Sequence, residues 1–285
     1  MPIPIPDATD EAAAQAVTKA AAARRLPQYL LSSALAGAYI GVAIVLLVSA
    51  AGPFAAAHSA ASKLVGGCVF GIALTLVVFA GAELFTGNVM LMVGGLIKGR
   101  VRLRDVLAVN IASLVGNFVG SVAFAAMVHA SGALTAGGKG TTPAPAAAMI
   151  TSLAKAKVAA SGGQLFWRAV LCNMLVCLAL WMAARTRSES AKLVVLFWGL
   201  LAFVAAGFEH SVANMTVFSL AVFQGSAHWG DLARNLLFTV PGNVVGGALL
   251  VAAPYAWLGR SANAPTAPTV RHGDIPIELP EPATV

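Results

Sequence analysis

Two polar clusters with ionisable side chains interrupt otherwise apolar stretches of the sequence. Glu83 lies in the first cluster, and Glu209 and His210 lie in the second. An ionisable group inside a bilayer is costly unless it is paired or hydrated, so such groups mark functional sites by default. A carboxylate accepts hydrogen bonds, and an imidazole can donate a hydrogen bond or a proton to a passing anion. The sequence therefore predicts a polar path for a solute through a membrane.

The two clusters are copies of one motif. Residues 81–88 and 207–214 both read Gly-x-Glu-x-x-x-x-Asn and begin 126 residues apart. The pentapeptides at 116–120 and 242–246 both read Gly-Asn-x-Val-Gly and have the same offset. Two motifs that share one spacing indicate a duplicated unit, as in many transporter folds.

The composition is that of a membrane protein. Hydrophobic residues make up 59% of the 285 residues, charged residues make up 10%, and the mean hydropathy is +0.83. The net charge of +7 does not indicate nucleic-acid binding, because the basic residues lie between apolar runs rather than on one face. The three cysteines lie inside apolar runs without nearby histidines, so we expect no disulfide framework, metal site or cofactor.

The apolar runs predict six membrane spans, two of them broken. The run between Lys63 and Lys98 has 34 residues, about 50 Å as one straight helix, which is far more than a bilayer needs. We expect this span to break at Glu83–Asn88, and span 5 to break in the same way. Irregular backbone at membrane depth is tolerated only where protein or a water-lined cavity covers it. The six predicted spans are 28–51, 64–97, 106–130, 164–184, 193–227 and 235–258, with a kink at Pro241 in the last.

The segments around these spans complete the predicted domain organisation. Residues 1–27 form a cytoplasmic segment with a short surface helix at 7–25, and it lacks the pattern of a secretory signal. Residues 131–163 read as a periplasmic loop, and residues 259–285 as a disordered cytoplasmic tail. One side of the membrane then holds 12 Lys and Arg residues and the other 6, which places both termini in the cytoplasm. Each repeat, about 28–130 and 164–258, has three spans, so the second copy is inverted.

The residues alone leave several roles open. For Glu83 and Glu209 we favour a structural role, in which each carboxylate accepts hydrogen bonds from backbone N–H groups freed by the break. His210 has Leu84 as its repeat partner, so the fold does not require a titratable group there, and we favour a functional role. Thr86 either contacts the solute or caps the backbone at the first break. Lys157 is either a solvated lysine or a group that attracts anions. Four apolar residues either belong to the core or form a constriction of the path: Phe70, Phe203, Leu74 and Leu84.

Three segments resemble the formate/nitrite transporter family, with flanking residues most similar to its nitrite branch. They are residues 80–88, 207–215 and 172–179, and the likeness covers about residues 28–258. The resemblance implies an all-α integral membrane protein, an aquaporin-like protomer with six transmembrane helices, assembled as a homopentamer with one pore per subunit. Residues 159–163 lack the histidines that some relatives carry there. The resemblance also implies roles for single residues. Phe70 and Phe203 would form an outer constriction and Leu74 and Leu84 an inner one, with His210 facing Thr86 at the centre. Lys157 would lie in the vestibule, Asn173 and Asn243 near the path, and the broken helices would be supported by Glu83, Asn88, Glu209 and Asn214.

These features predict a channel or proton-coupled permease for a small monovalent anion of a weak acid. The resemblance favours nitrite in a bacterial inner membrane, with formate as the alternative substrate and hydrosulfide or acetate behind it. A membrane enzyme using His210 and Ser211 as base and nucleophile is a distant alternative, because neighbouring residues rarely point at each other. A sensor would need a binding domain, and neither tail is long enough to fold alone. Direction of transport, coupling to protons and gating by the tails stay open.

Overall fold

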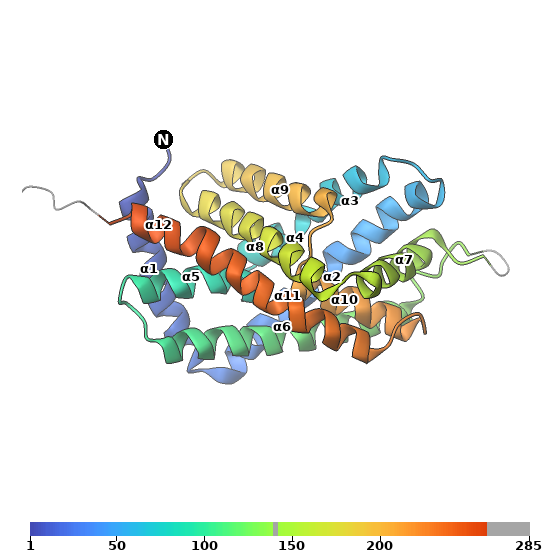
Figure 1. The fold of residues 1–285 in the computed structure, drawn as a ribbon, viewed down its shortest axis with the longest axis horizontal. Helices are drawn as coiled ribbons and strands as arrows, with labels where there is room; N and C mark the ends of the chain where they lie inside the picture. The colour runs from blue at the N-terminus through green and yellow to red at the C-terminus, as the bar shows by residue number, and fades with distance from the viewer. Residues whose placement is uncertain (139–141, 261–285) are drawn as a thin grey trace, which may run out of the picture.

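The chain is a bundle of helices that run roughly side by side. The structure, a computed structural model, describes residues 1–138 and 142–260, and in this part of the chain it contains twelve α-helices and one π-helical turn (Figure 1). Their bounds are α1 (Ile5–Ala23), α2 (Leu26–Ala56), α3 (Ser62–Phe70), α4 (Ile72–Phe79), α5 (Phe85–Ile97), α6 (Leu103–Ser131), α7 (Pro145–Ala159), α8 (Gly162–Ala184), α9 (Glu189–Ala206), α10 (Ser211–Phe223), α11 (Trp229–Gly247), the π-helical turn Ala248–Ala252 and α12 (Ala253–Leu258).

Six helical segments of the described residues are long and apolar enough to cross a membrane. Helices α3 and α4 form one of them together, as do α11, the π-helical turn and α12. The two shorter apolar helices, α5 and α10, follow the second and fifth spans. The all-α fold with six spans and broken helices 2 and 5 is therefore confirmed. Pro241 lies inside α11, and the predicted kink there stays a prediction.

The first break lies slightly earlier than the sequence predicts. Residues 80–84 are non-helical, whereas residues 85–88 already form the first turn of α5, so the predicted interval Glu83–Asn88 is wrong over its last four residues. Gly81 ends the preceding helix with φ +75°, and the Ala82 N–H donates to the Val77 carbonyl at 2.9 Å. Gly207 ends α9 with the same φ, and the second break is formed by residues 207–210, before α10. Glycine adopts this left-handed conformation at little cost, so it marks the end of a helix rather than the middle of the break.

The two repeats are built on close helix crossings. Helix α2 packs along α6, and α8 packs along α11. At Gly120 an added Cβ atom would lie 1.8 Å from the Ala34 carbonyl oxygen, and at Gly246 it would lie 2.2 Å from the Val170 carbonyl oxygen. These glycines belong to the repeated Gly-Asn-x-Val-Gly motif. The motif therefore brings two backbones together at the same place in each half.

Helix α7 occupies part of the segment predicted as a loop. The prediction of a loop throughout residues 131–163 is wrong, because residues 145–159 are helical, with Pro145 at the start of the helix. Ala147, Ile150 and Ala154 are buried, and α7 packs against α2 and α10. The spacing of these three residues is that of one helix face. The high Gly, Ala and Pro content of the segment favours a loop in a sequence-based prediction, which therefore overlooks this helical spacing.

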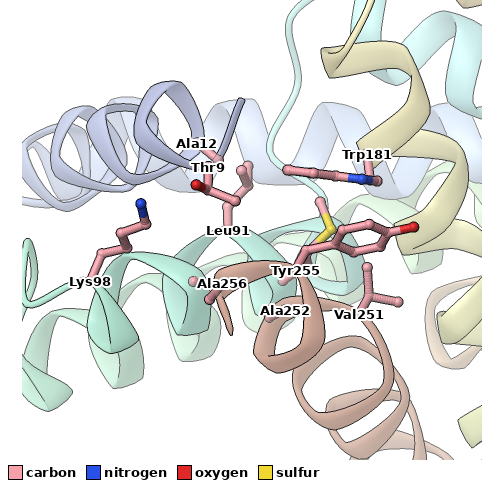
Figure 2. A pocket seen from close by; sticks show the side chains of 11 residues that line it. Thr9, Ala12, Leu91, Lys98, Trp181, Val251, Ala252, Tyr255 and Ala256 are labelled. Carbon is pink, nitrogen blue, oxygen red and sulfur yellow. The ribbon is translucent and has the colours of Figure 1, made fainter. Parts of the chain in front are cut away.

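Helix α1 covers the opposite end of the bundle from α7 (Figure 1). The predicted helix in the N-terminal segment is confirmed, but it is not a free surface helix, because Ala8, Ala13 and Ala16 are buried. Lys98 forms an ion pair with Asp10 at 2.8 Å. Figure 2 shows the small pocket beside α1, where the rings of Trp181 and Tyr255 lie 4.6 Å apart between centroids. Of the predicted tail at 259–285, residues 261–285 lie outside the described residues.

Candidate functional site

Two buried asparagines hold the two breaks in the same way. The Asn117 side chain accepts a hydrogen bond from the Phe85 N–H at 2.9 Å and donates to the carbonyl oxygens of Glu83 and Ser33 at 2.9 and 2.7 Å. These bonds satisfy backbone groups that the interrupted helix leaves free. The first break is therefore fixed by a side chain of α6.

Asn243 repeats this arrangement from α11. Its side chain accepts from the Ser211 N–H at 2.9 Å and donates to the carbonyl oxygens of Glu209 and Ala169 at 3.1 and 2.8 Å. Asn117 and Asn243 lie 126 residues apart, as do the backbone groups that they bind in the breaks. The family resemblance implies a place near the path for Asn243, and its contacts give it a structural role.

The Glu83 carboxylate binds side chains rather than freed backbone groups. Its Oε2 atom accepts hydrogen bonds from Lys19 Nζ at 2.6 Å, the Tyr29 hydroxyl at 3.1 Å and Asn88 Nδ2 at 3.0 Å. Lys19 comes from α1 and Tyr29 from α2. The cluster therefore ties the N-terminal helix to the first break.

The Glu209 carboxylate has an equivalent set of partners. Its Oε2 atom accepts from Lys157 Nζ at 2.8 Å and from Asn214 Nδ2 at 2.7 Å, and Asn214 also donates to the Asn235 side chain. The prediction that freed backbone N–H groups bind the two carboxylates is wrong for the described residues. The side chains of Asn117 and Asn243, which we call the asparagine clamps, already accept hydrogen bonds from backbone N–H groups of the breaks. Glu83 instead pairs with a lysine from α1, and Glu209 pairs with a lysine from α7.

His210 and Thr86 meet between the two breaks. His210 Nε2 lies 3.1 Å from Thr86 Oγ1, and both side chains are buried. His210 Nδ1 accepts the Ala213 N–H at 3.2 Å, so the ring proton of this neutral tautomer lies on Nε2 and points to the threonine. Asn173 donates to the Thr86 carbonyl at 3.2 Å and to the Asn243 carbonyl at 2.7 Å. The predicted pair is therefore brought together, and Asn173 links it to the second break.

Apolar side chains surround this pair. The ring of Phe203 stacks on His210 with centroids 5.9 Å apart, and it meets Phe70 edge-on at 5.7 Å. Leu74 and Leu84 are buried in the same hydrophobic core. The structure thus brings Phe70 and Phe203 next to His210 and buries Leu74 and Leu84 in the same core, while their role as constrictions stays a prediction.

A cavity lies on each side of the pair. The first, of about 320 Å³, reaches His210 and Phe203 and contains Lys157 in its wall, and we call it the Lys157 cavity. The second, of about 390 Å³, reaches Leu84 and contains Lys19, and we call it the Lys19 cavity. Thr86 and Leu74 line neither cavity and are at most 2% exposed, so packed side chains separate the two spaces.

Both cavities carry more basic than acidic side chains. Lys63, Lys157 and Arg168 line the Lys157 cavity against Glu209 as its acidic residue. Lys19 and Lys192 line the Lys19 cavity with Glu83, and Lys192 also pairs with Glu189 at 2.8 Å, so the excess of positive charge is larger in the Lys157 cavity. Walls with an excess of positive charge raise the local concentration of anions. The arrangement therefore suits a path for small anions that has two vestibules and a packed centre.

Serine 211 does not form a catalytic pair with the histidine. Both ring nitrogens of His210 are directed to other groups, and the buried Ser211 hydroxyl has no hydrogen-bond partner among the described residues. A histidine that acts as a base on a serine must lie within hydrogen-bond reach of its hydroxyl. This geometry gives no support to the enzyme alternative.

Sequence reasoning missed three side chains of the site. Asn117 shares the 126-residue offset with Asn243, so its role could have been found from the repeat. Lys19 lies outside the repeat, and its contact with Glu83 joins residues 64 positions apart. Arg168 lies near the start of a predicted span, and no motif marks it.

The two lysine–glutamate pairs differ in burial, which predicts different effects on stability. Replacing Lys157 by Met leaves the Glu209 carboxylate unpaired at 4% exposure, whereas Lys19→Met leaves the Glu83 carboxylate at 19% exposure. Removing one partner of a buried pair costs about 3–5 kcal/mol, and solvent reduces this cost. We expect the larger drop in thermal unfolding midpoint for Lys157→Met in detergent. Equal drops would contradict this assignment.

Comparisons with known proteins agree with this architecture. The family described as Formate/nitrite transporter matches residues 6–257. The nitrite transporter NirC of Escherichia coli (strain K12) is 40% identical over 242 residues, which cover 84% of this chain and 86% of that protein. A solved structure titled FNT family ion channel has a TM-score of 0.79 and 37% identity, covering 88% of this chain and 98% of that chain. A second solved structure, titled pentameric formate channel with formate bound, has a TM-score of 0.69 and 26% identity, covering 82% of this chain and 97% of that chain.

The family match and these relatives agree with the two breaks and the cation-lined cavities described above. This chain is a multi-pass membrane transporter or channel of the formate/nitrite transporter family.

Proposed function

We propose that the protein moves nitrite, a small monovalent anion of a weak acid, between the Lys157 and Lys19 cavities. The observation that carries this proposal is the His210–Thr86 contact, which lies between two cavities that are both rich in basic side chains. Similarity to the nitrite transporter NirC supports nitrite as the substrate. Formate is the second candidate, because a related structure is titled a formate channel with formate bound.

The packed centre of the path selects for a weak acid. Stripping an anion of water in an apolar neck is costly, so the side chains around Phe70, Phe203, Leu74 and Leu84 oppose hydrated ions. His210 donates its Nε2 proton toward Thr86 Oγ1, which leaves the threonine hydroxyl proton free to donate to the solute. A hydrogen bond from this hydroxyl lowers the barrier for the anion at this point, and the proton that the anion takes up comes from water in the adjoining cavity, so that His210 stays neutral. Transport is therefore proton-linked and depends on pH.

The same comparisons and the charge distribution support an assembly and an orientation. A related structure is titled a pentameric formate channel, which supports a homopentamer with one path in each subunit. The excess of Lys and Arg on the side of the termini supports a cytoplasmic α1, with the Lys157 cavity open to the outside. We assign the bacterial inner membrane, in line with the nitrite transporter NirC of Escherichia coli as a relative.

A competition flux assay tests the substrate. Purified protein in proteoliposomes is supplied with nitrite and formate, each alone and then together. We expect saturable nitrite flux that formate inhibits only at higher concentration. If formate is the better substrate, the second candidate is correct. If neither anion moves faster than through protein-free liposomes, the proposal is wrong.

Replacing His210 by Asn is expected to lower nitrite flux about tenfold and to flatten its dependence on pH. The imidazole holds the Thr86 hydroxyl in position to donate to the anion, and a hydrogen bond to a charged group contributes about 1.5–3 kcal/mol, which is tenfold or more in rate. Initial flux is measured between pH 5 and 8. Rising acidity should increase wild-type flux, because the anion held beside His210 and Thr86 takes up a proton from the cavity water more often, and the variant without the imidazole loses this step.

Two threonine variants provide a matched control for the centre of the path. Thr86→Val removes the hydroxyl beside His210 Nε2, whereas Thr216→Val removes a buried hydroxyl in α10 that has no partner among the described residues. Flux should fall for Thr86→Val and stay near wild type for Thr216→Val. An unchanged rate and pH profile in His210→Asn would refute the role of the histidine.

A further inference from the structure

Arg168 is a cation in the wall of the Lys157 cavity that forms no close ion pair with an acidic side chain of the described residues, although its charge acts on the nearby Glu209 carboxylate. It lies on α8, half-buried, and lines the same cavity as Glu209 and His210. Among the described residues its guanidinium has no ion pair within 4.0 Å and no hydrogen-bond acceptor. An Arg side chain that lines a membrane-embedded cavity needs water or a solute as its hydrogen-bond partner, so its N–H groups are available to a solute that replaces this water.

The other basic residues of this cavity are less suited to hold an anion. Lys157 is committed to Glu209 at 2.8 Å, so the pair presents little net charge to a solute. Lys63 is exposed, and water and salt screen an exposed ammonium. Arg168 therefore supplies the positive charge that is both unpaired and partly shielded from solvent.

The position of Arg168 relative to the central pair is fixed by backbone contacts. Its carbonyl oxygen accepts the Glu209 N–H at 3.3 Å, so its backbone touches the second break. It precedes Asn173 by five residues on α8, which corresponds to about 7.5 Å along the helix axis. Asn173 in turn donates to the Thr86 carbonyl. The guanidinium thus belongs to the cavity side of the neck, before the contact between His210 and Thr86.

We propose that Arg168 is the first binding group for planar monoanions with two oxygens that enter through the Lys157 cavity. A guanidinium presents parallel N–H groups that bind two oxygens of one planar anion at once, which a lysine ammonium does not do. Nitrite and formate both have this shape, and hydrosulfide does not. Arg168 is then a specificity-determining residue, and this proposal rests on the function proposed above.

The proposal predicts an effect that depends on the side of entry. Arg168→Gln should raise the half-saturating concentration of nitrite and formate about tenfold for entry from the Lys157 side, since it removes a charge-assisted bidentate contact. Entry from the Lys19 side should keep its half-saturating concentration. The maximal rate should stay near wild type, because the contact between His210 and Thr86 is intact.

Arg168→Lys separates charge from shape. Compared with Arg168→Gln, it should return the half-saturating concentration of hydrosulfide to the wild-type value. The half-saturating concentrations of nitrite and formate should return only part of the way. Lys63→Gln is the matched control, because it removes an exposed cation from the same cavity and should change half-saturation less than about twofold. Initial rates are measured in right-side-out and inverted membrane vesicles with each anion.

Three results would overturn the proposal: unchanged half-saturation in Arg168→Gln, equal shifts for both directions of entry, or full recovery of nitrite entry in Arg168→Lys. A loss of thermal stability together with equal loss in both directions indicates a structural role instead. Stabilisation of the detergent-purified protein by added sodium nitrite or sodium formate, compared with sodium chloride, provides a readout independent of flux. If wild type moves no anion, the proposed function fails, while loss of this stabilisation in Arg168→Gln still tests the binding group.

Discussion

Replacing Asn243 by Leu is expected to abolish transport and to prevent stable folding. The substitution keeps the size of the side chain but removes its hydrogen bonds to the Ser211 N–H and to the carbonyl oxygens of Glu209 and Ala169. Each buried polar group left unpaired costs about 1–3 kcal/mol. Three such groups together consume a large part of the roughly 5–15 kcal/mol by which a folded domain is stable. The second break would then lose its shape, and His210 its place.

Two matched variants distinguish this mechanism from a general cost of losing an amide. Asn117→Leu should be as damaging, because Asn117 holds the first break through three equivalent bonds. Asn110→Leu should be close to neutral, because Asn110 bonds only to a carbonyl of its own helix and its Oδ1 atom is buried without a partner among the described residues. Thermal unfolding midpoints and the yield of folded protein from size-exclusion chromatography compare the three. An Asn243→Leu protein as stable as Asn110→Leu would contradict the clamp.

The repeat was readable from the sequence because each copy performs the same structural task. Asn117 and Asn243 bind the same backbone positions of the two breaks, and Glu83 and Glu209 each pair with a lysine and with the asparagine five residues later. Because the same side chain must bind the same backbone groups in each half, both halves carry the same residues at the same spacing. The duplicated motifs therefore predicted both breaks. The resemblance to the family then predicted the meeting of His210 and Thr86.

The partners of the carboxylates could not be predicted in this way. Lys19 and Lys157 come from α1 and α7, which lie outside the repeated spans and share no motif. Their contacts with Glu83 and Glu209 join residues 64 and 52 positions apart, and helix packing alone sets which side chains meet over such distances. The position of each carboxylate beside the break predicted backbone N–H groups as its partners, whereas helix packing brought a lysine ammonium to each carboxylate instead.

Helix α7 shows a second limit. Alanine, glycine and proline in residues 131–163 are typical of a loop, yet a helix with small residues packs closely where neighbouring helices leave little room. The buried face of Ala147, Ile150 and Ala154 contacts α2 and α10, which a single sequence does not place beside it. The position of Lys157 at the last turn of this helix, and hence its reach to Glu209, followed from that packing.

Gly246→Ala is expected to cause the second large loss, through the backbone rather than through polar groups. The added Cβ atom would lie 2.2 Å from the Val170 carbonyl oxygen, a distance that no carbon and oxygen tolerate, so α11 must move away from α8. Overpacking of this kind costs about 1–3 kcal/mol and occasionally more. Gly120→Ala, with a Cβ atom 1.8 Å from the Ala34 carbonyl oxygen, should have a comparable effect on α6 and α2.

Gly94→Ala provides the control, because no atom lies within 4 Å of the added Cβ and alanine favours a helix by about 1 kcal/mol. It should leave the unfolding midpoint unchanged or raise it, whereas Gly246→Ala should lower it by several degrees. Asn243 lies one turn before Gly246 on α11, so separating α11 from α8 also pulls the clamp from the Ala169 carbonyl. Folded Gly246→Ala protein should therefore have reduced nitrite flux, while folded Gly94→Ala protein keeps it. Equal midpoints and equal flux in the two variants would mean that close contact of the backbones does not position the second break.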